Sequence, residues 1–201
     1  MKFLDCFCGM GGASEGFARE GFDCTGIDIV DVGYPYKLIL KDMRELDGND
    51  FKGYDIIWGS PPCRDFSPIA RIYGKRWKHK PNPENGLELV NTFLGFVGDA
   101  QPSFWIMENV HNLTLHLPKR PKIETYLRYK KHAFWGNFPF FLMPKIVGKP
   151  ITKGQLKNGL RYPQPRKRKR NTRIESAQHA KIPLPCSLAF AQACKEFLGS
   201  P

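Results

Sequence analysis

Short apolar runs alternate with stretches of helix-forming composition along most of the chain. The apolar runs predict strands at residues 2–7, 23–28, 38–40, 56–58, 103–107 and 132–139. Three other stretches predict helices, at residues 13–20, 87–97 and 187–198. Because strands alternate with helices, the pattern predicts an α/β fold with a Rossmann-like sheet and helices on both of its faces.

The first apolar run leads into a glycine-rich turn, Cys8-Gly9-Met10-Gly11-Gly12, and then into the first predicted helix. This succession opens a nucleotide-binding α/β unit, because glycines let the backbone approach a ligand and a helix start offers unpaired N–H groups. Asp28 ends the second run at the distance where such folds place a carboxylate on ribose hydroxyls. A tight turn without a ligand is the alternative reading of the glycines alone.

The run at residues 56–58 stops at Gly59 and is followed by two prolines, Pro61 and Pro62. Each proline fixes φ and removes a backbone donor, so the chain can neither continue the sheet nor begin a helix there. We therefore expect a stiff elbow at the carboxyl end of a strand, with Cys63 at its tip. Ligands of open α/β sheets bind at that edge. A small buried cysteine in a proline-rich turn is the alternative.

Positive charge is concentrated in one part of the chain. The protein has 31 Lys and Arg against 19 Asp and Glu, a net charge of +12. Residues 145–174 hold 11 of the basic residues and no acidic one, which leaves the remainder near neutral at 20 against 19. Such a segment predicts binding to a polyanion, or else a nuclear import signal at residues 166–170. The candidates for nucleic-acid contacts here are Arg166, Lys167 and Arg168.

A long loop at residues 65–86 follows the elbow and also carries basic side chains. Tyr73 and Trp77 lie among these basic residues, an arrangement that suits a lid closing on nucleic acid. The candidate contacts in and beside this loop are Arg64, Ser67, Arg71, Lys75 and Arg76.

The chain has 201 residues, enough for one well-buried domain. No run of about 18 apolar residues occurs, and Asp5 comes too early for the apolar core of a signal peptide. The six cysteines are irregularly spaced and include no Cys-x-x-Cys pair, which argues against a zinc site and against disulfides. We therefore expect an intracellular protein with no membrane contact, in the cytoplasm or at the nucleoid, or in the nucleus of a eukaryotic host.

Four signatures occur in one order along residues 1–140. They are Asp5-x-Phe7-Cys8-Gly9-x-Gly11-Gly12, Pro61-Pro62-Cys63-x-x-Phe66-Ser67, Glu108-Asn109-Val110 and Phe134-Trp135-Gly136-Asn137. Together they resemble the DNA cytosine-5 methyltransferase family, and the last signature most resembles its de novo branch. A weaker match lies at the C-terminal helix.

The resemblance implies a catalytic set built around Cys63. A thiolate there adds to C6 of cytosine so that C5 can attack a methyl group, and Glu108 protonates N3. Asn109 belongs to the same set. Lys130 and His132 stand where the family has two arginines. The base must leave the duplex to be reached, so the implied partner is DNA with a flipped-out cytosine, and RNA is the less favoured polymer.

The resemblance also implies S-adenosylmethionine as cofactor, in a Rossmann-like methyltransferase sheet. Asp28 would hold the ribose, Ile29 would pack on the adenine, and Asp42 and Met43 would recognise the adenine edge. The remaining implied contacts are Phe7, Gly9, Met10, Gly11, Gly12, Pro61 and Leu87. A nicotinamide-dependent oxidoreductase would explain the glycine turn and Asp28, but it gives Cys63 and Glu108 no role.

The chain departs from the family in three places besides residues 130 and 132. Arg64 replaces a common glutamine, and Pro185-Cys186-Ser187-Leu188 stands near the missing Gly-Asn-Ser-Val. The target-recognition domain is reduced to residues 145–177, so residues 1–144 and 178–201 form the expected catalytic domain. A short segment offers few groups for reading base edges, so we expect weak sequence discrimination. A tRNA methyltransferase and a catalytically weak DNA-binding relative are the alternatives.

Overall fold

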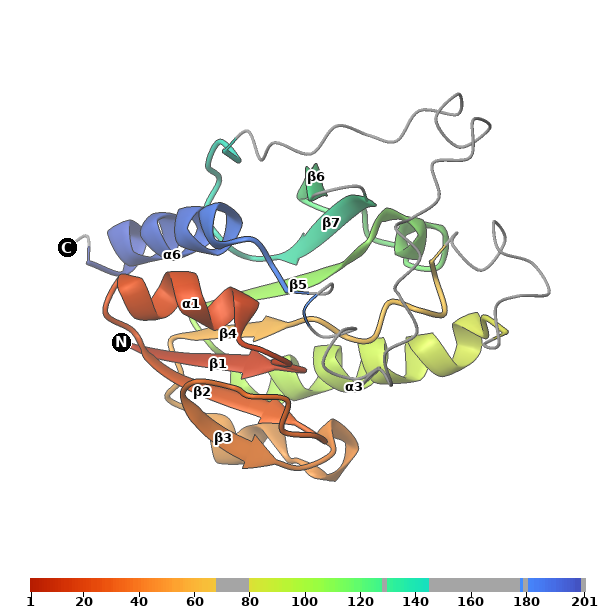
Figure 1. The fold of residues 1–201 in the computed structure, drawn as a ribbon, viewed down its shortest axis with the longest axis horizontal. Coiled ribbons are helices and arrows are strands. Elements are labelled where there is room, and N and C mark those ends of the chain that lie inside the picture. Colours follow the sequence, from red (N-terminus) through yellow and green to blue (C-terminus); the bar gives the residue numbers. More distant parts are fainter. Residues whose placement is uncertain (68–79, 128–129, 145–177, 179–180, 200–201) are drawn as a thin grey trace, which may run out of the picture.

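The computed structural model describes residues 1–67, 80–127, 130–144, 178 and 181–199. The centre of the molecule is a seven-stranded sheet in the order β3-β2-β1-β4-β5-β7-β6 (Figure 1). The basic loop at residues 68–79 and the basic segment at 145–177 lie outside the described residues. The strands are β1 (Lys2–Cys6), β2 (Asp23–Asp28), β3 (Lys37–Leu40), β4 (Ile56–Gly59), β5 (Phe104–Val110), β6 (Ile123–Leu127) and β7 (Lys130–Gly136).

The first five strands are parallel, and β7 and β6 add an antiparallel pair at one edge. The chain builds outward from β1 through β2 to β3, and then returns to place β4 on the other side of β1. The strand order therefore reverses between β1 and β4. Ligands of open α/β sheets bind outside the carboxyl ends of the strands at such a point.

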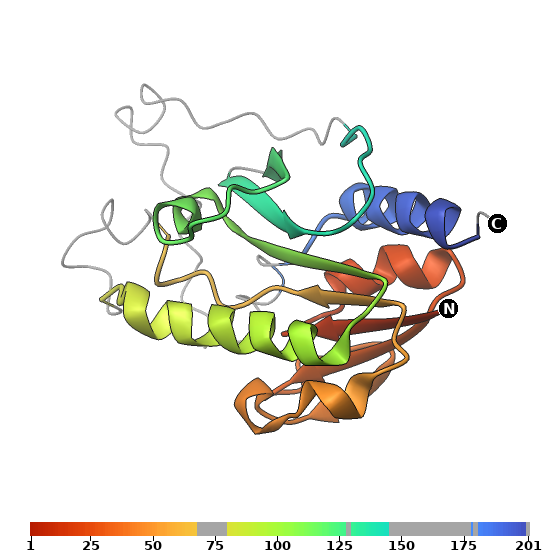
Figure 2. The same cartoon turned by 180° about the vertical axis from the view of Figure 1, so that it is seen from behind.

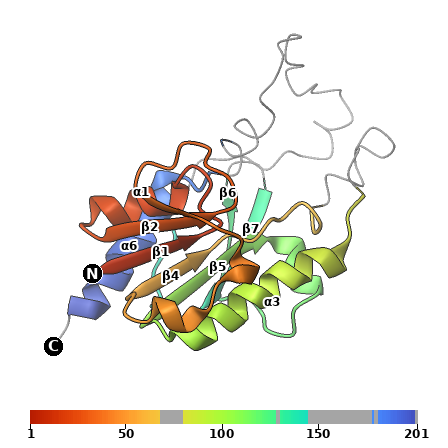
Figure 3. The same ribbon diagram turned by 90° about the horizontal axis from the view of Figure 1, so that it is seen from below.

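Helices cover both faces of the sheet, as the sequence predicts. Helices α1 (Gly12–Arg19) and α6 (Leu184–Gly199) lie on one face, and α3 (Pro83–Ala100) lies on the other (Figures 1–3). Three short 3-10 helices complete the described elements. They are η1 (Met43–Glu45), η2 (Gly48–Phe51) and η4 (His111–Leu115).

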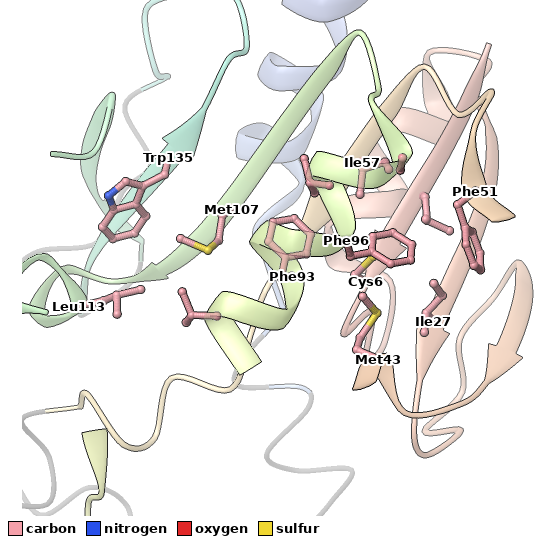
Figure 4. Packing of buried hydrophobic residues seen from close by; sticks show 14 of the residues in the cluster. Cys6, Ile27, Met43, Phe51, Ile57, Phe93, Phe96, Met107, Leu113 and Trp135 are labelled. Atoms are coloured by element: carbon pink, nitrogen blue, oxygen red, sulfur yellow. The ribbon is translucent and has the colours of Figure 1, made fainter. Parts of the chain in front are cut away.

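The central strands send alternate side chains into two separate cores. Phe3 of β1 packs under α1 and α6, whereas Leu4 packs under α3. The α3 side is filled by Phe93 and Phe96 together with Ile57 of β4 (Figure 4). Because the central strands are covered on both faces, consecutive residues of β4 are all buried, and its sequence is a continuous apolar run.

Helices α1 and α6 pack closely at Gly16. A Cβ atom added at Gly16 would lie 2.3 Å from the carbonyl carbon of Ser187, so only glycine lets the two helices approach to this distance. This contact joins the C-terminal helix to the helix that follows β1, on the same face of the sheet.

Several element boundaries differ from the sequence prediction. Helix α3 begins earlier than residue 87, because the Asn82 side chain caps it and Pro83 occupies its first turn. Strand β5 does not end at Met107 but continues through Val110. Strand β6 was not predicted. Within the described residues, no helix is long and apolar enough to cross a membrane.

Candidate active site

The glycine turn after β1 has three consecutive odd-numbered residues with positive φ. Phe7, Gly9 and Gly11 have φ values of 60°, 51° and 70°. A bulky residue such as Phe7 rarely adopts this conformation, and such backbone strain clusters at functional sites. The Gly9 N–H donates to Oδ2 of Asp28 over 2.9 Å, so the turn is tied to the end of β2.

The glycines of this turn serve different purposes. A Cβ atom at Gly12 would meet the backbone nitrogen of Ile182 at 2.4 Å, and one at Gly11 would press on the Tyr34 ring at 3.1 Å. At Gly9 the added atom would meet nothing within 4 Å. Gly9 is therefore the glycine of this turn beside which a ligand has room.

A cavity of about 250 Å³ lies beside the turn. It gathers side chains from the ends of β1, β2 and β3 and from the segment after β4. Five of its ten lining residues are predicted cofactor contacts, namely Phe7, Asp28, Ile29, Asp42 and Met43. Sequence reasoning missed the other five, which are Lys41, Arg44, Ser60, Pro62 and Leu89.

The remaining predicted cofactor contacts do not line this cavity. Pro62 and Leu89 line the cavity, whereas the predicted Pro61 and Leu87 do not. The only feature of the sequence that pointed to Pro62 and Leu89 was their nearness to the predicted pair. Leu87 instead packs against the core under α3. The other predicted contacts outside the lining are Gly9, Met10, Gly11 and Gly12.

Asp42 is held by Arg44 at the rim of the cavity. Its Oδ1 atom accepts from the backbone N–H and Nε of Arg44, both at 3.0 Å, and Oδ2 accepts from Nη2 at 2.6 Å. The Arg44 side-chain hydrogen bonds lower the pKa of the Asp42 carboxyl. Arg44 also contacts Glu88 of α3 at 3.2 Å, so it braces η1 against that helix.

Three buried side chains next to the glycine turn are joined by hydrogen bonds. The Ser14 hydroxyl donates to Oδ2 of Asp5 over 2.6 Å, and its oxygen lies 2.7 Å from the Tyr34 hydroxyl. Burial raises the pKa of Asp5 to about 7. These hydrogen bonds connect β1, α1 and the loop that follows β2.

The elbow after β4 forms where the two prolines predict it. Ser60 donates its N–H to the Cys6 carbonyl over 3.1 Å, and Asn109 Nδ2 donates to the Pro61 carbonyl over 2.9 Å. Cys63, half-buried, packs beside the core, and all six cysteines of the chain are thiols. The elbow is thus anchored both to β1 and to β5.

Glu108 and Asn109 lie within β5 instead of after it. Asn109 is fully buried, and its Oδ1 atom accepts from the Val110 N–H over 2.9 Å. Glu108 is 7% exposed, and its Oε1 atom contacts Nδ1 of His132 on β7. A side chain of the neighbouring strand therefore supplies a hydrogen-bonding partner for this buried carboxylate. Lys130 begins β7 opposite Leu127.

The predicted nucleic-acid contacts fall into two groups. Arg64 is exposed, with its Nε atom 4.0 Å from Oδ2 of Asp65, whereas Ser67 is buried. The others lie outside the described residues, namely Arg71, Lys75, Arg76, Arg166, Lys167 and Arg168. The elbow, Glu108 and the cavity all lie toward the carboxyl ends of the parallel strands.

Comparison with known proteins bears on this arrangement. The family model described as C-5 cytosine-specific DNA methylase matches residues 1–129. The type II methyltransferase M.FnuDI of Fusobacterium nucleatum is 32% identical over 121 residues, which are 56% of this chain and 33% of that protein. M1.HphI of Haemophilus parahaemolyticus is 26% identical over 200 residues, 89% of this chain and 52% of that protein.

Among solved structures, the methyltransferase EhMeth of Entamoeba histolytica is similar with a TM-score of 0.45 and 12% identity, over 76% of this chain and 57% of that chain. The chain spans between a third and about half of the length of M.FnuDI and M1.HphI. The family match covers well over half of the chain and contains both the elbow and Glu108. By that match, the chain belongs to the C-5 cytosine-specific DNA methylase family.

Proposed function

We propose that the protein transfers a methyl group from S-adenosylmethionine to C5 of a flipped-out cytosine in DNA, through a covalent bond between Cys63 and C6. One observation carries this proposal. The elbow lines the cavity with Ser60 and Pro62, while Asn109 binds its Pro61 carbonyl to β5. The segment that ends in Cys63 therefore lines the cavity and is also hydrogen-bonded to the strand that carries Glu108.

In the proposed reaction, the Cys63 thiolate forms a bond to C6 of cytosine. Electron density moves toward N3, which takes a proton from the Glu108 carboxyl group, and C5 becomes nucleophilic. After the methyl group has reached C5, a base removes the C5 proton. The C6–S bond then breaks, N3 returns its proton to Glu108, and Cys63 leaves as thiolate.

The cavity fits the proposed cofactor by the chemistry of its walls. Phe7, Ile29 and Met43 offer apolar surface to a purine, and Asp28 and Asp42 offer carboxylates to hydroxyl and amino groups. When bound, S-adenosylmethionine would supply an electrophilic methyl group. The two carboxylates and the apolar residues would orient it.

Asn109 acts in this proposal through the elbow. It is fully buried and donates to the Pro61 carbonyl, so it fixes the position of the elbow relative to β5. Register supports this arrangement, because Gly59 pairs with Met107 one residue before Ser60 and Glu108. The segment that bears the nucleophile therefore leaves β4 beside the part of β5 that carries Glu108.

The proposed substrate is duplex DNA, and the proposed site of action is inside the cell, where that DNA lies. Residues 1–144 and 178–201 would form the catalytic domain, and residues 145–177 would neutralise phosphates with little reading of base edges. We therefore propose a short sequence context of two or three bases. Arg64, exposed beside Cys63, would meet the phosphates that flank the target base.

A methyl-transfer assay tests the substrate. Tritiated S-adenosylmethionine is incubated with duplex DNA or with tRNA, and bisulfite sequencing then locates the methylated cytosines. We expect label in DNA at a short sequence context. We also expect none from Cys63→Ser, whose folding is checked by thermal unfolding. Label in tRNA alone would contradict the DNA substrate, and a long unique recognition sequence would contradict weak discrimination.

A further inference from the structure

His132 lies against the buried carboxylate of Glu108. In the antiparallel ladder Glu108 pairs with Phe134 and Val110 pairs with His132, so the two side chains are diagonal neighbours on one face. Their side chains are 10% and 16% exposed, and Nδ1 of His132 contacts Oε1 of Glu108. Within the described part of the chain, His132 is the side chain that hydrogen-bonds to this carboxylate.

The groups around this pair are mostly uncharged. On β6, Thr125 is the register partner of His132. From α6, the buried Cys186 thiol approaches, and its pKa is raised by burial and then by the Glu108 charge. Among the described residues, the imidazole is therefore the hydrogen-bonding side chain in contact with this carboxylate.

Building on the proposed function, we infer that His132 is the positioning residue for Glu108. It holds Oε1, which fixes the plane of the carboxyl group and leaves Oε2 for N3 of the target base. When Glu108 has given its proton to N3, the Nδ1–H of His132 donates to the carboxylate that remains. When the C6–S bond breaks, the N3 proton returns to Glu108 and the same hydrogen bond persists.

This arrangement has a consequence that an arginine at this position would not have. An imidazole exchanges its proton in the physiological pH range, whereas a guanidinium does not. His132→Arg should therefore change the pH dependence of kcat and leave the KM for S-adenosylmethionine unchanged.

The test compares three substitutions at residue 132 with a matched control. His132→Ala removes the contact, His132→Gln keeps a hydrogen-bonding side chain without charge, and His132→Arg restores a fixed charge. The control is His111→Gln, which breaks a second histidine–glutamate contact, 2.5 Å between His111 Nδ1 and Glu124 Oε1, at the surface. Turnover, the KM for S-adenosylmethionine and the pH profile are measured for each, with thermal unfolding as a check on folding.

We expect His132→Ala to lower kcat by about 10- to 100-fold, part of what general acid catalysis contributes, with little change in KM. His132→Gln should recover part of this loss, and His132→Arg should change the pH profile. His111→Gln should match the wild type. If His132→Ala turns over within about twofold of the control while the wild type is active, or if the His132→Arg profile superimposes on that of the wild type, the inference is wrong.

A spectroscopic measurement separates this inference from the proposed function. In protein labelled with ¹⁵N at the imidazoles, Glu108→Gln should move the Nδ1 resonance of His132 and leave that of His111 in place. This result does not require turnover, so it supports the contact even if no methyl transfer is found. An unmoved His132 resonance overturns the inference and leaves the proposed function standing on its own assay.

Discussion

The buried carboxyl group of Asp5 should make the stability of the whole domain depend on pH. Asp5 is 2% exposed at the end of β1, where it accepts a hydrogen bond from Ser14. Burial raises its pKa from 3.8 to about 7, so near neutral pH the folded protein holds a proton that the unfolded chain has lost. Asp5→Asn replaces this carboxyl with a neutral amide of the same shape.

The sign and size of the effect follow from proton linkage. Between about pH 4 and pH 7 the folded state binds one more proton than the unfolded state at this residue, so stability falls as pH rises and levels off above pH 7. Each pH unit is worth about 1.4 kcal/mol, so the full window of about three units amounts to about 4 kcal/mol. The free energy of unfolding of Asp5→Asn should not show this decrease, because its amide does not titrate.

Urea unfolding at pH 5 and at pH 8, at constant ionic strength, measures the prediction. The fluorescence of buried Trp58 offers one probe of the transition. Other titrating groups are shared by the wild type and Asp5→Asn, so they largely cancel in the difference between the two. We expect the variant to gain about 3 kcal/mol relative to the wild type between pH 5 and pH 8. A difference that does not change with pH would refute the reasoning.

Three further substitutions, one of them with a matched control, test the supports of the site. Asn109→Ala leaves the Pro61 carbonyl without its partner; urea unfolding should show a loss of about 1–3 kcal/mol, together with slower methyl transfer. Gly16→Ala forces α1 away from α6, and the same method should show a loss of about 1–3 kcal/mol or more in the free energy of unfolding. In the control Gly98→Ala the added methyl group meets no neighbouring atom, so α3 should be stabilised by up to about 1 kcal/mol. Arg44→Gln releases η1 at the cavity rim and should weaken binding of S-adenosylhomocysteine about two- to fivefold by calorimetry.

The sheet could be predicted from the sequence because its central strands are covered on both faces. Strand β4 appears as an unbroken apolar run, and β1 and β2 keep enough buried apolar residues to be found close to their true limits. Strand β6 was missed although Ile123, Thr125 and Leu127 alternate with the more exposed Glu124 and Tyr126. It is short and lies at the edge of the sheet, where little burial marks it.

The end of β5 was misjudged for a physical reason. Glu108 and Asn109 are polar, and polar residues after an apolar run usually signal the end of a strand. Here each has a partner that lies far away in the sequence: His132 for Glu108, and the Pro61 carbonyl for Asn109. A strand can bury polar side chains when such partners exist, and no local pattern reveals them.

The cavity shows the same limit. Asp28 could be placed there from its position at a strand end, because carboxyl ends of parallel strands meet at one edge, whereas Phe7 and Asp42 were placed there by the family resemblance. Leu89 could not be told from Leu87, since both are apolar residues near the start of one helix. Only the rotation of α3 against the sheet decides which of them reaches the cavity.

Trapping the nucleophile on its substrate tests the central claim most directly. Duplex DNA that contains 5-fluorocytosine is incubated with the protein and S-adenosylmethionine, because fluorine at C5 prevents the elimination that would release the enzyme. We predict a denaturation-resistant protein–DNA complex in which peptide mapping finds the pyrimidine bound to Cys63, and no such complex with Cys63→Ala. A correctly folded wild-type protein that methylates DNA and yet forms no adduct, or one whose adduct lies on another residue, would contradict the account.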